Sequence, residues 1–452
     1  MVKLINLFMS FKIDKQTLDD LVVFGNNRTK SVFEIYNKTY TRGGARILEN
    51  MFKYPLSDAD KINERSDMIH YYYDIKAVFP FRAEIFDSME FYLSNTDLRT
   101  QLMRQDNTLE NKFKNLVGSS TEYTQITNGI ISCIELLNTL EEFLGHSTDK
   151  VVNPNVLQMM EELRRLLNFE GWSWYKAEKG KKKVSYDKAV DYDRIFRFEE
   201  NLRLKKILDY VYHLDVYVAV AAVARERNFC FAKALPNETN VLDMQGIFHP
   251  FLEKPISNNI HVDENSNVIF LTGANMAGKS TFMKTFGIAL FLAHVGFPLP
   301  AEKMTFSVQN GMYTTINLPD NLKMGYSHFY AEVLRLKKVA LEVRNTQHLV
   351  IVFDELFRGT NVKDAFDATV AVTGALAKIR NCTFMISTHI IEAGAELRKH
   401  CDNINFVYLP TKMDGNKPIY TYKIAPGITD DRHGMKIVNN EHIIEILKNG
   451  EI

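Results

Sequence analysis

The sequence predicts a chain of two parts, an all-α domain over residues 1–240 followed by an α/β domain over residues 241–452. Apolar positions at helical spacing, with few glycines and prolines, fill the first part. From Val268 onward, short apolar runs of strand length alternate with helical segments, which is the pattern of a mostly parallel sheet. Short strands and turns occupy residues 228–267, so we place the boundary between residues 235 and 241.

The first part is expected to hold long amphipathic helices. Two helices separated at Pro55 are expected between residues 47 and 78, and amphipathic segments continue over residues 84–168. From Leu202 to Ala222 the apolar positions keep helical period for several turns. Such a helix is longer than a compact domain usually needs, which favours a role as a lever or spacer.

The strand candidates of the second part outline its sheet. They are Val268–Leu271, Leu349–Phe353, Thr383–Ser387, Phe406–Leu409 and, after an Asp414-Gly415 turn, a hairpin strand over Ile419–Ile424. A glycine-rich loop follows the first of them, and apolar residues at helical spacing follow the loop. A phosphate-binding loop requires this order of strand, loop and helix.

The glycine-rich loop reads GANMAGKST and fits the pattern G-x-x-x-x-G-K-[ST]. Its glycines let backbone amides turn toward an anion, and the N-terminus of the following helix adds a partial positive charge. Lys279 can reach the β- and γ-phosphates of a nucleotide, and the Ser280 hydroxyl can complete the shell of a Mg²⁺ ion. A chance glycine-lysine turn is the alternative, which the flanking strand and helix disfavour. The predicted site comprises Gly273, Ala274, Asn275, Met276, Ala277, Gly278, Lys279, Ser280 and Thr281.

Two carboxylates end the strand candidate LVIVFDE. At the carboxyl edge of a buried strand, Asp354 and Glu355 would lie beside the phosphate loop. Asp354 would hold Mg²⁺ together with Ser280, and Glu355 would orient and deprotonate the attacking water. The alternative is an acidic strand-to-helix turn without catalytic function. It is disfavoured because the pair follows a phosphate loop within an α/β pattern.

Two further residues are candidates for contacts to the γ-phosphate. His389 closes the strand candidate FMISTHI, and the order of the strands would place its imidazole where it senses whether that phosphate is present. A surface or core histidine is the alternative. Ser327, in the segment GYSHFYAE, precedes a helix. A serine there can cap its own helix, or it can contact the γ-phosphate of a nucleotide bound by a second subunit, and both roles stay open.

Composition and charge limit the class of partner. Lysine plus arginine and aspartate plus glutamate both number 55, so attraction of the whole chain to DNA should be weak and would depend on local basic patches. One candidate patch is the stretch WSWYKAEKGKKK, whose lysines are Lys176, Lys179, Lys181, Lys182 and Lys183. It is either a contact to nucleic-acid phosphates or a solvated loop between helices.

Cysteine use and hydropathy predict the compartment. The four cysteines are scattered, without the spacing of a metal site, which favours a reducing environment. No uninterrupted apolar run reaches the length of a membrane span. We therefore expect a cytoplasmic protein that does not bind membranes.

These motifs together resemble the MutS family of DNA mismatch repair ATPases, and the resemblance runs from about Tyr40 to Lys436. TGANMAGKST is similar to the family's phosphate loop, with Ala274 where proline is usual. FDELFRGTNVKDAFDAT and GYSHFYAE resemble its acidic and serine motifs, and STHI resembles its histidine segment. The resemblance implies an ABC-type P-loop ATPase domain preceded by a helical core and lever domain. It also implies a dimer that uses ATP and Mg²⁺ to move its levers around DNA.

The sequence also departs from the family pattern. Nothing resembles the N-terminal domain that reads mismatches, so we expect DNA, as mismatched or branched duplex, to be recognised by shape rather than by its bases. Pro255 stands ahead of Asn258-Asn259 where relatives carry an aromatic residue that stacks on adenine, and Phe357 replaces a glycine. The alternative function is an ATPase switch that acts on a protein or ribonucleoprotein without recognising mismatches. We expect a homodimer.

Overall fold

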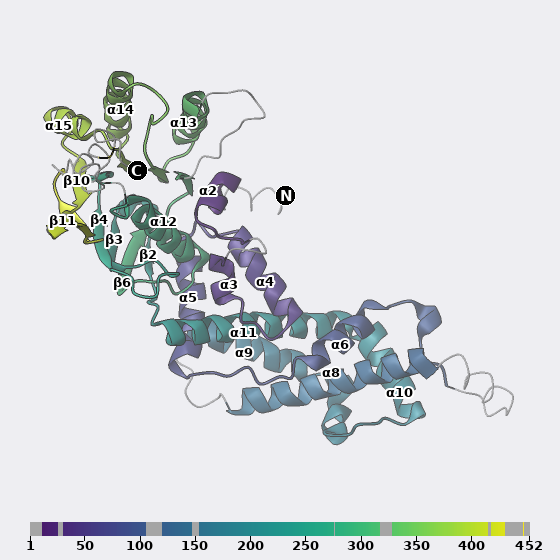
Figure 1. Ribbon diagram of the computed structural model, residues 1–452. Coiled ribbons are helices and arrows are strands. Elements are labelled where there is room, and N and C mark those ends of the chain that lie inside the picture. Colours follow the sequence, from purple (N-terminus) through teal and green to yellow (C-terminus); the bar gives the residue numbers. More distant parts are fainter. Residues whose placement is uncertain are drawn as a thin grey trace. The chain divides into compact units, whose positions relative to one another are not determined.

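The computed structural model describes residues 11–25, 30–104, 120–146, 153–274, 276–316, 328–414 and 417–429, together with Ile446. The chain forms two compact units (Figure 1). The sheet unit comprises Met1–Tyr36, Met51–Ser66 and Val223–Ile452, and the helical unit comprises Asn37–Asn50 and Asp67–Ala222.

The sheet unit is built on a seven-stranded sheet in the order β1-β7-β8-β9-β5-β10-β13. Its strands are β1 (Lys12–Ile13), β5 (Val268–Gly273), β7 (Gly311–Thr315), β8 (Leu349–Phe353), β9 (Thr383–Ser387), β10 (Ile404–Leu409) and β13 (Ala425–Pro426). All neighbours are parallel except β13, which is antiparallel to β10. Every residue of β5, β7, β8 and β9 is buried, as in parallel strands covered on both faces. The four strands predicted for this sheet are confirmed.

Helices connect these parallel strands and cover the sheet (Figure 1). They are α12 (Lys279–Val295), α13 (His328–Asn345), α14 (Val362–Ala377) and α15 (Ile391–His400), and α2 (Lys15–Asp20) and α3 (Val32–Tyr36) lie earlier in the chain. Nearly every residue of α12 is buried, which explains why this helix is apolar on all sides. The carboxyl ends of β5, β8 and β9 meet at one edge of the sheet, where ligands of α/β proteins bind.

A second sheet and a hairpin complete the sheet unit. The four-stranded sheet has the order β2-β6-β3-β4, with β2 (Lys233–Leu235), β3 (Leu242–Ile247), β4 (Asn258–Val262) and β6 (Lys303–Ser307). The hairpin pairs β11 (Thr411–Asp414) with β12 (Lys417–Tyr420). The predicted hairpin is confirmed, but its second strand ends at Tyr420 rather than Ile424. Tyr422 has a φ of 53°, which is incompatible with an extended strand.

The described residues of the helical unit form helices and no strands. Its helices are α6 (Glu84–Ser94), α8 (Ser120–His146), α9 (Pro154–Leu167), α10 (Tyr186–Asp193), the short helix η1 (Leu98–Thr100), the 3₁₀ helix η2 (Glu170–Glu178) and the π-helix η3 (Arg194–Glu199). Three helices, α4 (Arg42–Lys53), α5 (Ala59–Asp74) and α11 (Asn201–Arg227), contain residues of both units. The break predicted at Pro55 and the long helix predicted after Leu202 are both confirmed.

The long helix α11 bears on the prediction that no apolar run reaches the length of a membrane span. By length and composition this helix could cross a membrane. Its apolar residues do not form an uninterrupted run, because Asp209 and Asp215 lie among them. However, 72% of its most apolar window is buried inside the protein, as in the core helix of a globular fold. Asp215 is itself buried, and its carboxylate accepts hydrogen bonds from the backbone N–H groups of Tyr40 (2.9 Å) and Thr41 (2.8 Å).

The two units divide the chain differently from the boundary predicted at residue 240. Met1–Tyr36 and Met51–Ser66 belong to the sheet unit, although both precede that boundary. The cause is local: β1 joins the edge of the large sheet beside β7, and α2 follows it directly. A two-residue strand has too little pattern to be recognised from sequence.

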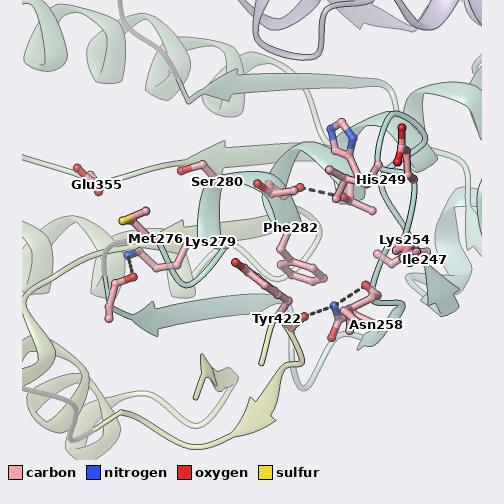
Figure 2. Close-up of a pocket in the computed structure, with 17 residues that line it drawn as sticks. Ile247, His249, Lys254, Asn258, Met276, Lys279, Ser280, Phe282, Glu355 and Tyr422 are labelled. Carbon is pink, nitrogen blue, oxygen red and sulfur yellow. Dashed lines mark hydrogen bonds between the residues drawn. The ribbon is translucent and has the colours of Figure 1, made fainter. Parts of the chain in front are cut away.

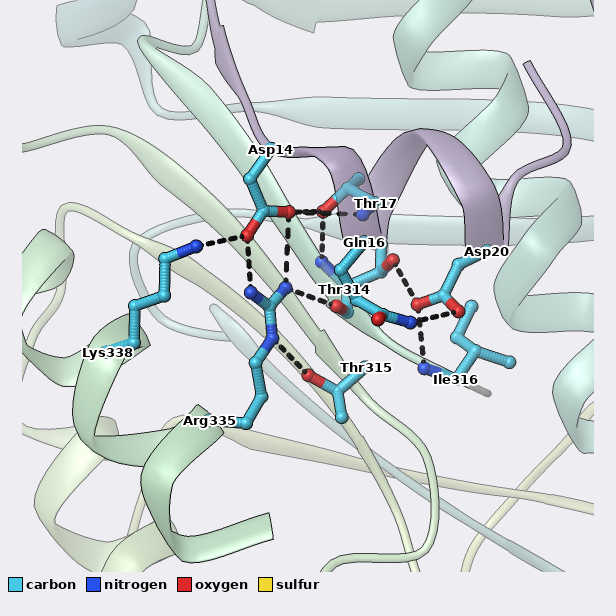
Figure 3. Close-up of polar contacts among 9 residues, drawn as sticks. All are labelled: Asp14, Gln16, Thr17, Asp20, Thr314, Thr315, Ile316, Arg335 and Lys338. Carbon is cyan, nitrogen blue, oxygen red and sulfur yellow. Dashed lines mark hydrogen bonds and ion pairs between the residues drawn. The ribbon is translucent and has the colours of Figure 1, made fainter. Parts of the chain in front are cut away.

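Charged residues fix this N-terminal segment to the sheet unit (Figure 3). Asp14 accepts hydrogen bonds from Arg335 and from Lys338 (2.9 Å), both on α13. Asp20 is buried and accepts a hydrogen bond from the Thr314 hydroxyl of β7 (2.7 Å). Burial alone would raise the pKa of Asp14, but its hydrogen bonds from Arg335 and Lys338 hold that pKa well below its ordinary value. The segment therefore ties β7 to α13.

Candidate functional site

The predicted phosphate loop lies between β5 and α12. Gly273 and Gly278 have φ values of 151° and 101°, which glycine adopts without strain. Lys279 is buried, and its Nζ donates hydrogen bonds to the carbonyl oxygens of Gly273 (2.9 Å) and Ala274 (3.2 Å). Burial lowers the pKa of Lys279, although neighbouring carboxylates oppose this shift. The side chain of Lys279 thus folds back onto the phosphate loop, whose carbonyl oxygens it contacts.

The other predicted loop residues differ in their surroundings. Ala277 is buried in the fold, whereas the side chain of Met276 is 79% exposed. Asn275 and Ser327 lie outside the described residues. The roles proposed for Asn275 and Ser327 stay predictions.

A cavity of about 640 Å³ opens beside the loop (Figure 2). This volume is typical of small-molecule sites. The phosphate loop and the start of α12 supply Ala274, Met276, Gly278, Lys279, Ser280, Thr281, Phe282 and Thr285. The remaining lining residues are Ile247, His249, Leu252, Glu253, Lys254, Ile256, Asn258, Glu355 and Tyr422. The cavity therefore joins predicted phosphate-binding groups to a wall of apolar, aromatic and charged side chains.

Ser280 and Asp354 meet at the edge of the sheet, as predicted. The Ser280 hydroxyl donates a hydrogen bond to Oδ2 of Asp354 at 2.5 Å, and the Ser387 hydroxyl donates to the other carboxylate oxygen. Hydroxyl and carboxylate oxygens are ligands that Mg²⁺ prefers. The described residues contain no group of three or more His, Cys, Asp or Glu side chains able to hold a metal. With their two oxygens, Ser280 and Asp354 fit a Mg²⁺ ion whose other ligands would be water and phosphate.

Glu355 lines the cavity and is held by two basic side chains. Its Oε1 lies 2.5 Å from Nε2 of His389, and its Oε2 accepts a hydrogen bond from Arg358 at 3.2 Å. The hydrogen bond with His389 lowers the pKa of Glu355 despite partial burial. The structure therefore brings His389 and Glu355 together at the carboxyl ends of the neighbouring strands β9 and β8, a contact that was not predicted from the sequence.

The backbone after Asp354 is strained. Glu355 and Phe357 have φ values of 52° and 64°, in the left-handed region. That region costs an L-residue roughly 1–2 kcal/mol. Leu356 and Phe357 are 8% and 4% exposed, so their buried side chains help to hold the turn. Backbone strain of this kind persists only where its surroundings fix it.

Tyr422 is a cavity residue that sequence reasoning missed. Its carbonyl oxygen accepts a hydrogen bond from the Asn258 side chain (3.0 Å), whose Oδ1 in turn accepts from the Ile424 backbone N–H (2.8 Å). The tyrosine ring lies so close to the loop that a Cβ added to Gly278 would be 3.1 Å from it. The two tyrosines of the segment IYTY were the one feature of the sequence that could have indicated an aromatic residue at a ligand site. Pro255 is not among the lining residues, although Lys254 and Ile256 on either side of it are.

The lysine-rich stretch belongs to the helical unit, and part of it is helical rather than a loop. Its aromatic part forms η2, in which Trp172 and Tyr175 are buried. Ion pairs join Lys176 to Glu141, Lys179 to Glu142 and Lys181 to Glu178.

Lys182 and Lys183 differ from these three lysines. Both are exposed, and neither makes an ion pair with another described residue. Of the five lysines predicted to contact phosphate, two therefore remain available.

The parallel sheet, the glycine loop and the acidic strand end define a P-loop nucleotide-binding domain of the α/β class. Comparison with known protein families identifies the group more closely. A model of MutS domain III matches residues 16–221, and a model of MutS domain V matches residues 269–449. The chain belongs to the MutS family, whose domain V is a P-loop ATPase domain.

Individual relatives agree with this assignment. The chain is 23% identical to the DNA mismatch repair protein MutS of Thermotoga sp. (strain RQ2) over 94% of its own length and 63% of that protein. It is 28% identical to the DNA mismatch repair protein MutS of Clostridioides difficile (strain 630), over 58% of the chain and 28% of the relative. It is 31% identical to MutS protein homolog 4 of Homo sapiens, over 52% of the chain and 25% of that protein. The chain thus spans less than two thirds of the length of each relative.

Proposed function

We propose that the chain binds ATP with Mg²⁺ in this cavity and hydrolyses it to ADP and phosphate. The observation that carries the proposal is the meeting of the phosphate loop with the acidic end of β8, in which Ser280 contacts Asp354 and Glu355 lines the cavity. A phosphate cradle, a pair of metal-binding oxygens and a candidate base are the parts that phosphoryl transfer to water requires.

Each group has a distinct task in this reaction. Lys279 would leave the loop carbonyls and pair with the β- and γ-phosphates. Ser280 and Asp354 would hold Mg²⁺, which neutralises phosphate charge. Glu355 would accept a proton from the attacking water as its oxygen bonds to the γ-phosphorus and the bond to the ADP oxygen breaks. His389 shares a hydrogen bond with Glu355, so we propose that it reports the presence of the γ-phosphate to that carboxylate.

Tyr422 supports a nucleoside rather than a bare polyphosphate as the ligand. Its ring lies beside Gly278 at the phosphate loop, within the same cavity. An aromatic face at that position offers a stacking surface for a purine base. We propose that Tyr422 supplies the contact that relatives obtain from an aromatic residue near the position of Pro255.

We also propose that ATP turnover drives movement of the helical unit around DNA, in a cytoplasmic homodimer. Membership of the MutS family, and the similarity to DNA mismatch repair proteins, support a DNA partner. Helix α11, which is 27 residues long, is a suitable lever. Lysines contact phosphates without reading bases, so we expect mismatched or branched duplex to be recognised by shape.

The alternative is a MutS-like ATPase switch for a protein or ribonucleoprotein partner. One observation favours it: Lys176, Lys179 and Lys181 are neutralised by neighbouring carboxylates. Binding constants on duplex, mismatched and four-way DNA at one stated salt concentration separate the two functions. Binding to none of these substrates would favour the alternative.

Two substitutions test the ATPase proposal. Lys279→Ala should weaken binding of a fluorescent ATP analogue, because it removes the cation of the phosphate cradle. Glu355→Gln should keep that binding and lose turnover by roughly a hundredfold or more, since an amide cannot take the proton of water. Phosphate release measured with saturating ATP and Mg²⁺ gives the rates. Wild-type turnover in Glu355→Gln would show that the base is another group.

A further inference from the structure

The loop that joins β8 to α14 holds its strained conformation through an aromatic side chain. Phe357 stands where the family pattern has a glycine, and its φ of 64° is one that glycine adopts freely. Phenylalanine has no such freedom, so the surrounding structure must hold it there. Glu355, two residues earlier and also left-handed, is the proposed base.

The ring of Phe357 is anchored on α13. It is 4% exposed and packs against Phe329, with ring centroids 6.1 Å apart and ring planes tilted by 53°. The loop backbone also lies directly against the first turn of α13, because a Cβ added to Gly359 would be 2.6 Å from the Phe329 nitrogen. Leu356 and Val339 belong to the same apolar cluster. The left-handed turn is therefore clamped between β8 and α13.

Polar contacts hold Glu355 on its other side. Its backbone N–H donates a hydrogen bond to the Ser387 hydroxyl at 3.2 Å. Its carboxylate contacts His389 and Arg358, whose side chains are 39% and 73% exposed. These polar partners can exchange with water or with a ligand, whereas the buried ring of Phe357 cannot.

We infer that Phe357 is a positioning residue for the proposed base. Its ring, packed on Phe329, fixes the left-handed turn that places the Glu355 carboxylate at the cavity. The position of that carboxylate thereby depends on the position of α13. The inference rests on the proposed ATP hydrolysis and adds to it a residue that acts on the reaction without touching the substrate.

Two substitutions in the full chain test this role by steady-state ATP hydrolysis. Phe357→Gly permits the same φ but removes the ring, and Phe357→Leu keeps a buried apolar side chain. We expect Phe357→Gly to lower kcat by about tenfold or more, since small misplacements of catalytic groups have effects of this size. KM and the affinity for a fluorescent ATP analogue should stay within about twofold, and Phe357→Leu should recover most of kcat.

A matched control separates positioning from general destabilisation. Leu376→Ala removes a similarly buried side chain of the same cluster at the far end of α14. It should lower thermal stability without changing kcat.

The outcomes distinguish this inference from the proposed function. Wild-type kcat in Phe357→Gly, or an equal loss in Leu376→Ala, would overturn the positioning role. Lys279→Ala and Glu355→Gln are measured in the same assay. If both keep wild-type turnover, the proposed function fails and the inference fails with it. If both lose turnover while Phe357→Gly keeps it, only the inference fails.

Discussion

His294 on α12 makes the stability of the sheet unit depend on pH. The ring is fully buried and stacks on Phe11 with centroids 4.1 Å apart. Its Nδ1 lies 2.8 Å from the Leu56 carbonyl oxygen, to which it donates, and its Nε2 accepts a hydrogen bond from the Gln309 backbone N–H at 3.3 Å. Only a neutral ring with its proton on Nδ1 satisfies both bonds. A second proton on Nε2 would face the Gln309 N–H, so the fold excludes the cation.

The size of the effect follows from the pKa of His294. Burial lowers it to about 4, although the bond to Leu56 opposes the shift, whereas an unfolded histidine has a pKa of about 6.5. Between these two pKa values the unfolded chain binds more protons than the folded chain. The contribution of the neutral His294 to the free energy of unfolding is therefore fully present above about pH 6.5 and is lost as the pH falls toward 4. Linkage gives a loss of about 2 kcal/mol between pH 7.5 and pH 5, and about 3 kcal/mol in full.

Urea unfolding followed by circular dichroism measures this loss. Other groups also titrate, so the informative quantity is the difference between wild type and His294→Gln, which does not titrate. His294→Gln should be less stable at pH 7.5 because it loses the stacking on Phe11. The difference should shrink by about 2 kcal/mol at pH 5. An unchanged difference at the two pH values would refute the assignment of a neutral buried histidine.

Three further predictions concern the N-terminal segment, the cavity and the lysines. Asp14→Asn should lower the free energy of unfolding by about 3 kcal/mol, because it leaves the buried Arg335 without its carboxylate. Since the pKa of Asp14 is lowered in the folded protein, this contribution to stability should be present above about pH 4 and lost below it. Asp19→Asn, which breaks only the exposed pair with Lys15, should cost less than about 0.5 kcal/mol in the same urea titration. Tyr422→Ala should weaken ATP binding by about tenfold and Tyr422→Phe should not, measured by fluorescence titration, if the ring stacks on the base. Replacing Lys182 and Lys183 with alanine should reduce the slope of the logarithm of the duplex-DNA binding constant against the logarithm of the salt concentration by about 1.8. Replacing the paired Lys176 and Lys179 should change this slope less. Equal slopes in all variants would show that this stretch does not contact DNA.

The central strands and their helices could be predicted because their signals are local. Four continuous apolar runs became β5, β8, β9 and β10 with shifts of at most two residues at their ends. Burial on both faces makes β5, β8 and β9 largely apolar, so their pattern is visible in sequence. The strands β1 and β13 have two residues each, and long-range pairing alone creates them. Such strands leave no periodic signal.

The polar half of the candidate site was predictable for a related reason. Lys279, Ser280, Asp354, Glu355 and His389 each follow a recognisable strand, and parallel strands bring their carboxyl ends together. The position of Tyr422 in the cavity could not be predicted from the sequence. Tyr422 reaches the cavity after a hairpin, and its place depends on the hydrogen bonds between Asn258 and residues 422 and 424. No motif spacing encodes contacts between such distant segments.

The lysine-rich stretch shows why charge patterns predict surfaces less well than strands. Five lysines within eight residues suggested a patch for a polyanion, but the sequence gives no sign of which carboxylates face them. Glu141 and Glu142 lie on α8, and they reach Lys176 and Lys179 only through the packing of α8 against η2. Each such pair cancels a charge that could otherwise release a counterion from DNA. Lys182 and Lys183 are therefore the two lysines of the stretch whose charges no ion pair with another described residue offsets.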